Sequence, residues 1–201
     1  MTNQSEHLWL WADWPAPSHV RAGTSLRNGG ISLPPFDELN IGLHVGDDEN
    51  HVLSNRNILS QHLDLASDPV WLDQIHSSNI ISLDNRSIGT SADGSYTTKK
   101  KNACTIMTAD CVPILLCNAT GTKVAAIHAG WKGVCSGIIE KAVNLFSNAG
   151  TIYVWIGPCI SSDYYEVGRD VFEQCIDHDA SLKSAFIQRN EDHWYCDLVK
   201  T

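Results

Sequence analysis

Three apolar runs of the sequence end on side chains that could do chemistry. Cys111 opens the run in "TADCVPILL", directly after Asp110, and His128 closes the run in "AAIHAGWKG". His76 closes a third run, "LDQIH". Functional side chains are concentrated where a rigid element meets a loop. The sequence therefore marks Cys111, His76, His128 and Asp110 as candidate catalytic residues.

Two histidines and a cysteine could act in two ways. Imidazole and thiolate are preferred ligands of zinc, and three protein ligands leave one position of a tetrahedral site open. Alternatively, Cys111 as a thiolate and His128 as its base would make a cysteine hydrolase, with Asp110 orienting the histidine. His76 and Cys111 are 35 positions apart, and Cys111 and His128 are 17 apart. These spacings match no local metal motif, so they leave both possibilities open.

Candidate substrate-binding residues lie upstream, in a segment rich in glycine, proline and turn-forming residues. The segment, "TSLRNGGISLPPFDELNIGLHVGDD", contains Arg27, Asn40 and His44, and Arg56 follows it. A long segment with little regular structure is usually functional or mobile. The guanidinium groups of Arg27 and Arg56 match the geometry of phosphate, although each arginine could equally form a surface ion pair.

Composition restricts the class of protein. The 201 residues suit one domain, and 14 basic against 23 acidic residues give a net charge of −9. Such a surface repels nucleic acids and anionic lipids, so we expect neither as a partner. No apolar run approaches the roughly 20 residues that span a bilayer, and the first residues do not resemble a signal peptide. A cytoplasmic location follows, in which the seven cysteines stay reduced.

Hydrophobic periodicity predicts the elements that position these residues. Val52, Arg56, Leu59 and Leu63 share one side of a helix over 49–63. A second helix is predicted over 134–150, with Val134, Ile138, Ala142 and Phe146 on its buried face, and a third over 166–176. Strands are predicted over 69–76, 79–83, 103–108, 112–117, 123–128 and 151–157. The polar segment 90–102 is predicted to be a surface loop.

The loop "NATGT" between two of these strands predicts an antiparallel hairpin. Strands outnumber helices, so a mixed sheet with helices packed on it fits better than a doubly wound parallel fold. The predicted fold class is α+β, with a mixed β-sheet sandwich in a single domain.

Several motifs together resemble one known family. The stretches "LRNGGIS", "LNIGLHVGDD", "QIHSSN", "TADCVPILL", "AAIHAGWKG" and "GPCI...YYEVG" occur in the order found in the laccase-domain family. Its members are described as multicopper polyphenol oxidase-like proteins and as purine nucleoside phosphorylases. The resemblance covers residues 22–201, and residues 1–21 form an N-terminal segment of the same domain.

The resemblance implies a site and an activity. It implies that His76, Cys111 and His128 hold a metal ion, usually zinc and in some members copper. It further implies phosphorolysis of adenosine, inosine and methylthioadenosine, with some adenosine deaminase activity. Asp110 is then a candidate acid-base group, and Arg27, Asn40, His44 and Arg56 are candidates for binding nucleoside and phosphate. Members of the family usually continue with a C-terminal segment beyond the point where this sequence ends, at "WYCDLVKT".

Three other functions stay open at this stage. A copper-dependent polyphenol oxidase would agree with the older description of the family. A metal-free cysteine hydrolase would use Cys111 and His128 on amide bonds of a peptide or cell-wall precursor. A metal-binding module without catalytic activity is the third possibility. The sequence does not determine the physiological substrate, the metal or the number of subunits.

Overall fold

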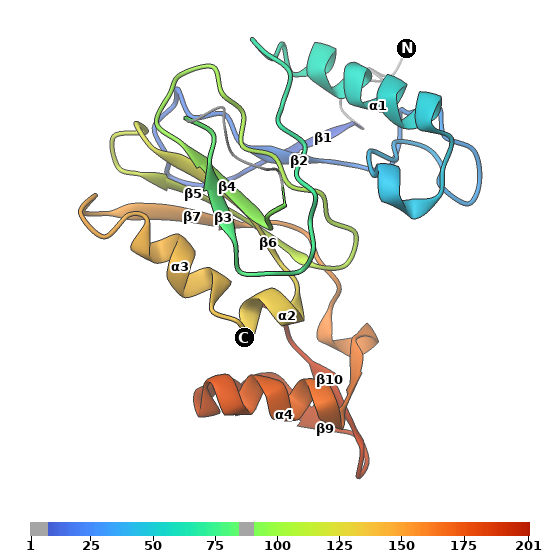
Figure 1. The fold of residues 1–201 in the computed structure, drawn as a ribbon, viewed down its shortest axis with the longest axis vertical. Helices are drawn as coiled ribbons and strands as arrows, with labels where there is room; N and C mark the ends of the chain where they lie inside the picture. The colour runs from blue at the N-terminus through green and yellow to red at the C-terminus, as the bar shows by residue number, and fades with distance from the viewer. Residues whose placement is uncertain (1–7, 85–90) are drawn as a thin grey trace.

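A mixed five-stranded sheet forms the framework of the molecule (Figure 1). The structure is a computed structural model that describes residues 8–84 and 91–201. The strand order is β3-β4-β6-β5-β7; β3 and β4 are parallel and the other neighbours are antiparallel. The strands are β3 (Ile80–Ser82), β4 (Gly94–Thr97), β5 (Val112–Asn118), β6 (Val124–Ala129) and β7 (Ile152–Ile156). The predicted α+β class is confirmed. Residues 1–7 of the expected N-terminal segment and residue 90 of the expected loop lie outside the described residues.

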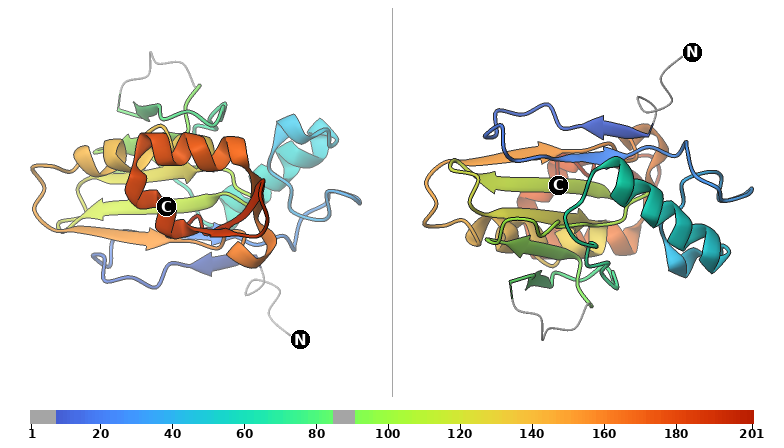
Figure 2. Two further views of the ribbon diagram at one scale, coloured as in Figure 1. Left: turned by 90° about the horizontal axis from the view of Figure 1, so that it is seen from below. Right: turned by 90° about the horizontal axis from the view of Figure 1, so that it is seen from above.

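The described residues also form two smaller antiparallel sheets. β1 (Trp9–Trp11) pairs with β2 (Gly23–Ser25), and β10 (His193–Cys196) lies between β8 (Glu166–Gly168) and β9 (Phe186–Gln188). Figure 1 shows the β1–β2 hairpin on one side of the large sheet, and the β8–β10 sheet with helix α4 beyond the other side. The two views of Figure 2 show the same arrangement from below and from above.

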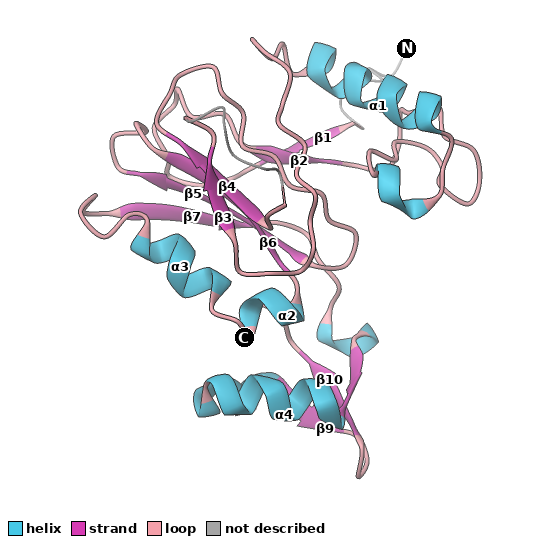
Figure 3. Ribbon diagram, viewed as in Figure 1, coloured by secondary structure: helices cyan, strands magenta, loops and turns pink. Residues whose placement is uncertain are grey.

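In the part of the chain that the structure describes, four α-helices pack around these sheets (Figure 3). They are α1 (Glu49–His62), α2 (Trp131–Val134), α3 (Ile138–Asn144) and α4 (Arg169–His178), and 3₁₀ turns occur at Leu43–Val45, Ser162–Tyr164 and Ala180–Ala185. Helix α1 begins where the Asp48 carboxylate accepts a hydrogen bond from the Asn50 N–H, which satisfies one of the free donors of the first turn. Val52 and Leu59 on its predicted inner face are buried. No helix of the described residues is long and apolar enough to cross a membrane.

The helix predicted over 134–150 is wrong in its extent but right in its buried face. The chain forms two short helices instead, because Gly137 between them has φ +77, a left-handed conformation that glycine adopts without steric cost. Val134, Ile138, Ala142 and Phe146 are all buried nonetheless. They pack on the side chains of β5 and β6 that point away from the β1–β2 hairpin, and this contact forms the main core.

The helix predicted over 166–176 begins only at Arg169, after strand β8. Three further predicted segments differ from the structure. The expected surface loop or hairpin end at 90–102 contains β4, the second strand of the large sheet. Asp93, directly before this strand, and Ser95 and Thr97 within it are almost fully buried. Residues 69–76 and 103–108 form no strand. Instead the Gln74 side chain donates to the Met107 carbonyl at 2.8 Å and accepts from the Met107 N–H at 2.6 Å. Hydrogen bonds of the Gln74 amide thus connect the two segments, in place of the backbone pairing between strands that their apolar runs predicted.

One pair of cysteines departs from the expectation of reduced thiols. Cys135, at the end of α2, and Cys175, in α4, form a buried disulfide between residues 40 positions apart. This bond connects α4 and the β8–β10 sheet to the segment that follows the His128 strand. Chain-entropy arguments give about 4 kcal/mol for a loop of this length.

We therefore expect thiol counting in denaturant, without reductant, to find Cys104, Cys111, Cys117, Cys159 and Cys196 free. The Cys175→Ser variant should lose about 2–4 kcal/mol of the free energy of unfolding in urea titrations. Cys159→Ser serves as the control, since this thiol forms no disulfide. Seven reactive thiols in the unreduced protein would contradict this prediction.

Candidate metal centre

The three candidate ligands converge at one end of the large sheet. His76 lies in the loop before β3, Cys111 directly precedes β5, and His128 lies near the end of β6. The antiparallel pairing of β5 with β6 sets Pro113 opposite His128, so that Cys111 and His128 share the same end. Their donor atoms and that of His76 all lie within 4.8 Å of one another. The Cys111 Sγ is 4.0 Å from His76 Nε2, and the imidazole centroids are 4.7 Å apart.

These distances and donor types fit a metal ion. Donor atoms around a tetrahedral zinc ion are about 3.3–3.6 Å apart, slightly closer than the 4.0 Å between Cys111 and His76. The chain leaves room for the ligands at Gly130, where a β-carbon would come within 2.9 Å of both the Cys111 Sγ and the His76 Cδ2. The three residues therefore form a His-Cys-His cluster suited to a metal ion.

A buried carboxylate organises two of the three ligands. Asp93, directly before β4, accepts a hydrogen bond at 2.9 Å from the His128 Nδ1 and another at 2.9 Å from the His76 backbone N–H. It also accepts from the backbone N–H and the hydroxyl of Ser77. The hydrogen bond to the Asp93 carboxylate keeps a proton on Nδ1, so that Nε2 is the ring nitrogen that can bind a metal ion once it has released its own proton. Metal-binding histidines commonly have such a carboxylate partner.

The backbone at His76 is held in an unusual conformation. Its φ of +57 lies in the left-handed region, which few residues other than glycine occupy. The hydrogen bonds from residues 76 and 77 to Asp93 hold this turn in place. Such conformations cluster at functional sites, where the surrounding structure determines them.

The pKa values of His76, His128 and Asp93 depend on one another. Burial lowers the pKa of His76, and the charge of His128 lowers it further. Burial also disfavours a charged His128, but hydrogen bonds to Asp93 and Cys111 outweigh it and raise the pKa of His128 to about 9. Burial disfavours ionised Asp93, but hydrogen bonds from His128 and Ser77 prevail and lower its pKa to about 2. Asp93 is therefore a carboxylate at neutral pH, able to accept the hydrogen bond that orients His128.

Asp110 and the four upstream candidates lie in different surroundings. Asp110 is exposed beside Cys111, and its backbone carbonyl accepts from the Ile160 N–H. Asp93, rather than Asp110, holds the ring of His128. His44 lies close enough for its charge to lower the pKa of His76.

Arg27 and Asn40 bond within their own segment. Arg27 pairs with Asp37 at 2.9 Å, and Asn40 donates to the Asp47 carboxylate. Arg56 donates to the Ile41 carbonyl and contacts the sulfur of Met107. Its guanidinium lies 4.2 Å from the centre of the Trp71 ring. Of these residues, Arg56 is tied to the Met107 segment that leads to Cys111, whereas the side chain of Arg27 is occupied by a carboxylate.

Asp93 was not among the candidates from the sequence, because it lies in a polar segment without apolar periodicity. A weaker signal was available: Asp93, Ser95 and Thr97 alternate with Gly94 and Tyr96, the period of two that a strand requires. Buried polar strands of this kind are stabilised by hydrogen bonds to distant residues, which local periodicity does not reveal.

The close approach at Gly130 yields a direct test of the cluster. In Gly130→Ala, the added methyl group would push Cys111 or His76 out of position, and we expect metal affinity to fall about 10–100-fold. Gly42→Ala is the matched control, because a β-carbon there meets its neighbours at 3.4 Å or more. Isothermal titration with zinc measures both variants. Unchanged affinity in Gly130→Ala would contradict the arrangement described above.

The sequence of the chain is similar to those of several known proteins. The sequence profile of a family described as multi-copper polyphenol oxidoreductase laccase matches residues 21–201. A purine nucleoside phosphorylase of Escherichia coli (strain K12) is 44% identical over 182 residues, which cover 90% of this chain and 75% of that protein. One from Pseudomonas aeruginosa is 43% identical over 196 residues, or 96% of this chain and 80% of that protein.

Solved structures show the same fold. A Neisseria meningitidis protein superposes with a TM-score of 0.86 at 37% identity, covering 95% of this chain and 79% of that chain. YlmD from Geobacillus stearothermophilus superposes with a TM-score of 0.83 at 29% identity, covering 98% and 79% of the two chains. The chain thus spans about three quarters to four fifths of the length of these proteins.

Proposed function

Since the chain belongs to the multi-copper polyphenol oxidoreductase laccase family, we propose that it is a zinc-dependent purine nucleoside phosphorylase. The proposed substrates are adenosine, inosine and methylthioadenosine with phosphate, and adenosine deamination is a side activity. The observation that carries the proposal is the convergence of His76, Cys111 and His128 on one point. The relatives named as purine nucleoside phosphorylases support the choice of reaction.

The donor set favours zinc. Two imidazoles and one thiolate form a ligand set found in catalytic zinc sites, where a fourth position stays open. When bound, the ion would supply a positive charge and a coordination position next to the reacting groups. Both features suit a protein of net charge −9, which otherwise disfavours an anionic substrate.

The chain's own residues would bind phosphate and move a proton. Phosphorolysis forms a bond from phosphate to the ribose C1′ and breaks the bond from C1′ to the purine, through a state with positive charge on the sugar. Arg56 and His44 are the proposed anchors for phosphate, since Arg56 contacts Met107 in the segment that leads to Cys111 and His44 is one of the groups that lower the pKa of His76. Arg27 and Asn40 could bind substrate only after their contacts with Asp37 and Asp47 are broken. Asp110, exposed beside Cys111, is the proposed group that protonates the departing purine.

The test is product analysis on the purified protein. With zinc and phosphate, inosine should yield hypoxanthine and ribose 1-phosphate, and adenosine should yield adenine and ribose 1-phosphate. Without phosphate, adenosine should yield inosine and ammonia. A chelator should abolish both reactions, and added zinc should restore them. The proposal fails if the zinc-loaded protein forms no free base from any of the three nucleosides.

A cysteine hydrolase is the second candidate, because one observation favours it. Asp93 accepts a hydrogen bond from His128, and a ring nitrogen of His128 lies within 4.8 Å of the Cys111 thiol, which resembles the order of acid, base and nucleophile in a catalytic triad. Such an enzyme would cleave amide bonds of a peptide or cell-wall precursor without a metal. It would survive chelation and would be inactivated by a thiol alkylating agent, whereas the phosphorylase would lose activity with the chelator.

The other two functions have less support. A multicopper oxidase needs several copper sites, and the described residues contain one cluster of three or more potential ligands, at His76, Cys111 and His128. A copper-thiolate site would absorb strongly in the visible range, where zinc is silent. A metal-binding module would bind the ion and turn over no nucleoside. A cytoplasmic location is part of the same proposal, because that compartment contains nucleosides and phosphate; the Cys135–Cys175 bond would then be one of the rare disulfides of that compartment.

A further inference from the structure

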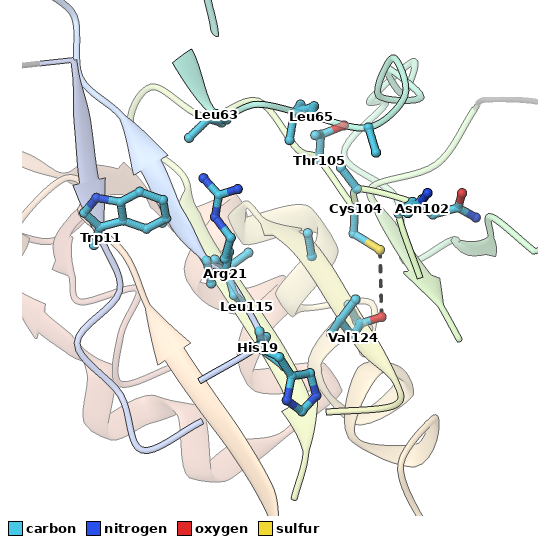
Figure 4. A pocket seen from close by; sticks show the side chains of 18 of the residues that line it. Trp11, His19, Arg21, Leu63, Leu65, Asn102, Cys104, Thr105, Leu115 and Val124 are labelled. Atoms are coloured by element: carbon cyan, nitrogen blue, oxygen red, sulfur yellow. Dashed lines mark hydrogen bonds between the residues drawn. The ribbon is translucent and has the colours of Figure 1, made fainter. Parts of the chain in front are cut away.

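A cavity lies over the large sheet, lined by residues of β5 and β6 (Figure 4). Val124 and Ala126, which line it, share their face of β6 with His128, and the cavity lies toward the other end of that strand. It has a volume of about 360 Å³ and lies between the β1–β2 hairpin and the sheet. Its floor includes Leu115 and Val124, near the loop that joins β5 to β6. None of the three metal-ligand candidates lines it. Its volume falls within the range of small-molecule sites.

The walls of this cavity are aromatic and apolar. Trp9, Trp11 and Trp14 line one side, and Leu63 and Leu65 line another. The rings of Trp9 and Trp11 meet edge to face, with centroids 5.9 Å apart. Trp11 is 51% exposed, which is unusual for so large an apolar side chain. Flat indole surfaces of this kind favour a planar ligand, because ring stacking adds to the burial of apolar area.

The charges around the cavity have the opposite sign to the protein as a whole. Arg21 and Lys101 line it together with one acidic residue, Asp64, although the net charge of the chain is −9. Figure 4 shows the Arg21 side chain projecting over Leu115 between Trp11 and Leu63. The cavity therefore presents a local positive charge beside apolar walls.

Arg21 is free to bind an anion. Its guanidinium lies 5.3 Å from the centre of the Trp11 ring. Within residues 8–84 and 91–201, no carboxylate forms an ion pair with it, whereas Arg27, Arg169 and Arg189 each have one. Stacking on an aromatic ring uses the face of the guanidinium and leaves its N–H groups available.

We propose that this cavity binds a planar aromatic molecule that carries a single anionic group, such as an aromatic carboxylate or sulfonate. The anion contacts the Arg21 guanidinium, and the ring system lies against Trp11 over Leu115 and Val124. This ligand differs from the neutral nucleosides of the proposed reaction. The site is separate from the metal cluster, so Arg21 has no part in the nucleoside chemistry.

Two fluorescent probes of similar shape test this inference. 1-Anilinonaphthalene-8-sulfonate is anionic, and N-phenyl-1-naphthylamine is its neutral counterpart. Both should bind the purified, zinc-loaded protein. Arg21→Ala should weaken the anionic probe about 10–100-fold, which is the effect of losing a hydrogen-bonded charge, and should leave the neutral probe unchanged. Trp11→Ala should weaken both.

Arg169→Ala is the matched control, because Arg169 also lies over an indole, that of Trp194 at 5.7 Å, but on the β8–β10 side of the molecule. This variant should bind both probes as the unaltered protein does. Arg21→Lys should recover part of the affinity for the anionic probe. Equal affinity for that probe in Arg21→Ala and the unaltered protein would overturn the inference, as would an equal loss in Arg169→Ala. Metal content and nucleoside cleavage should be unchanged in Arg21→Ala, which separates this test from that of the proposed function.

Discussion

Replacement of Cys111 by alanine is expected to abolish both metal binding and nucleoside cleavage. The thiolate is one of three converging donors, and two imidazoles alone leave the ion without its only anionic protein ligand. A bound cation contributes several kcal/mol to transition-state stabilisation, so its loss should lower the rate by at least about 1,000-fold. Metal analysis after dialysis and chromatography of inosine with phosphate measure the two effects.

Cys117→Ala provides the matched control for this variant. Cys117 is also a free thiol, at the other end of the same strand, and is fully buried away from the cluster. Compared with Cys111→Ala at equal folded fraction, this control should keep both metal and activity. If Cys111→Ala retained zinc with full activity, neither the ligand role nor the nucleophile role of Cys111 would stand. If the unaltered protein were active without metal and Cys111→Ala were inactive, the result would favour the hydrolase instead.

Replacement of Asp93 by asparagine is expected to lower both the stability of the protein and its affinity for zinc. The carboxylate accepts hydrogen bonds from His128, from the His76 backbone and from Ser77. The asparagine amide has one acceptor oxygen in place of the two of the carboxylate. Its NH₂ group would therefore face one of these buried N–H or O–H donors. A buried polar group without a partner costs about 1–3 kcal/mol of folding free energy. We also expect about a 10–100-fold loss of zinc affinity, because the orientation of His128 and the turn at His76 both depend on this group.

Asp84→Asn separates stability from ligand orientation. Asp84 also accepts hydrogen bonds from a backbone N–H and from hydroxyl groups, of Thr97 and Thr98, and these outweigh burial and lower its pKa to about 2. It does not contact the cluster. Urea unfolding should show a loss of stability in both variants, whereas zinc titration should show weaker binding only in Asp93→Asn. Wild-type zinc affinity in Asp93→Asn would contradict the positioning role.

The sequence alone was sufficient for the parts of the site that depend on neighbouring residues. Two apolar runs joined by the short loop "NATGT" can pair only with their far ends together, and this brings Cys111 beside His128. The helical spacing of Val52 and Leu59 likewise predicted a buried face that the structure contains. These features follow from local geometry, because periodicity and loop length restrict which atoms can meet.

The tertiary structure alone decided the contacts between segments far apart in the chain. Asp93 and His128 are 35 positions apart, Gln74 and Met107 are 33 apart, and Cys135 and Cys175 are 40 apart. Polar groups such as Asp93 become buried only because distant donors satisfy them, and a polar segment considered by itself resembles a surface loop. Within one segment, too, the sequence did not show that Asp37 pairs with Arg27 and occupies its guanidinium. Local patterns record which side of an element is apolar, whereas the partners of polar groups depend on how the elements pack together.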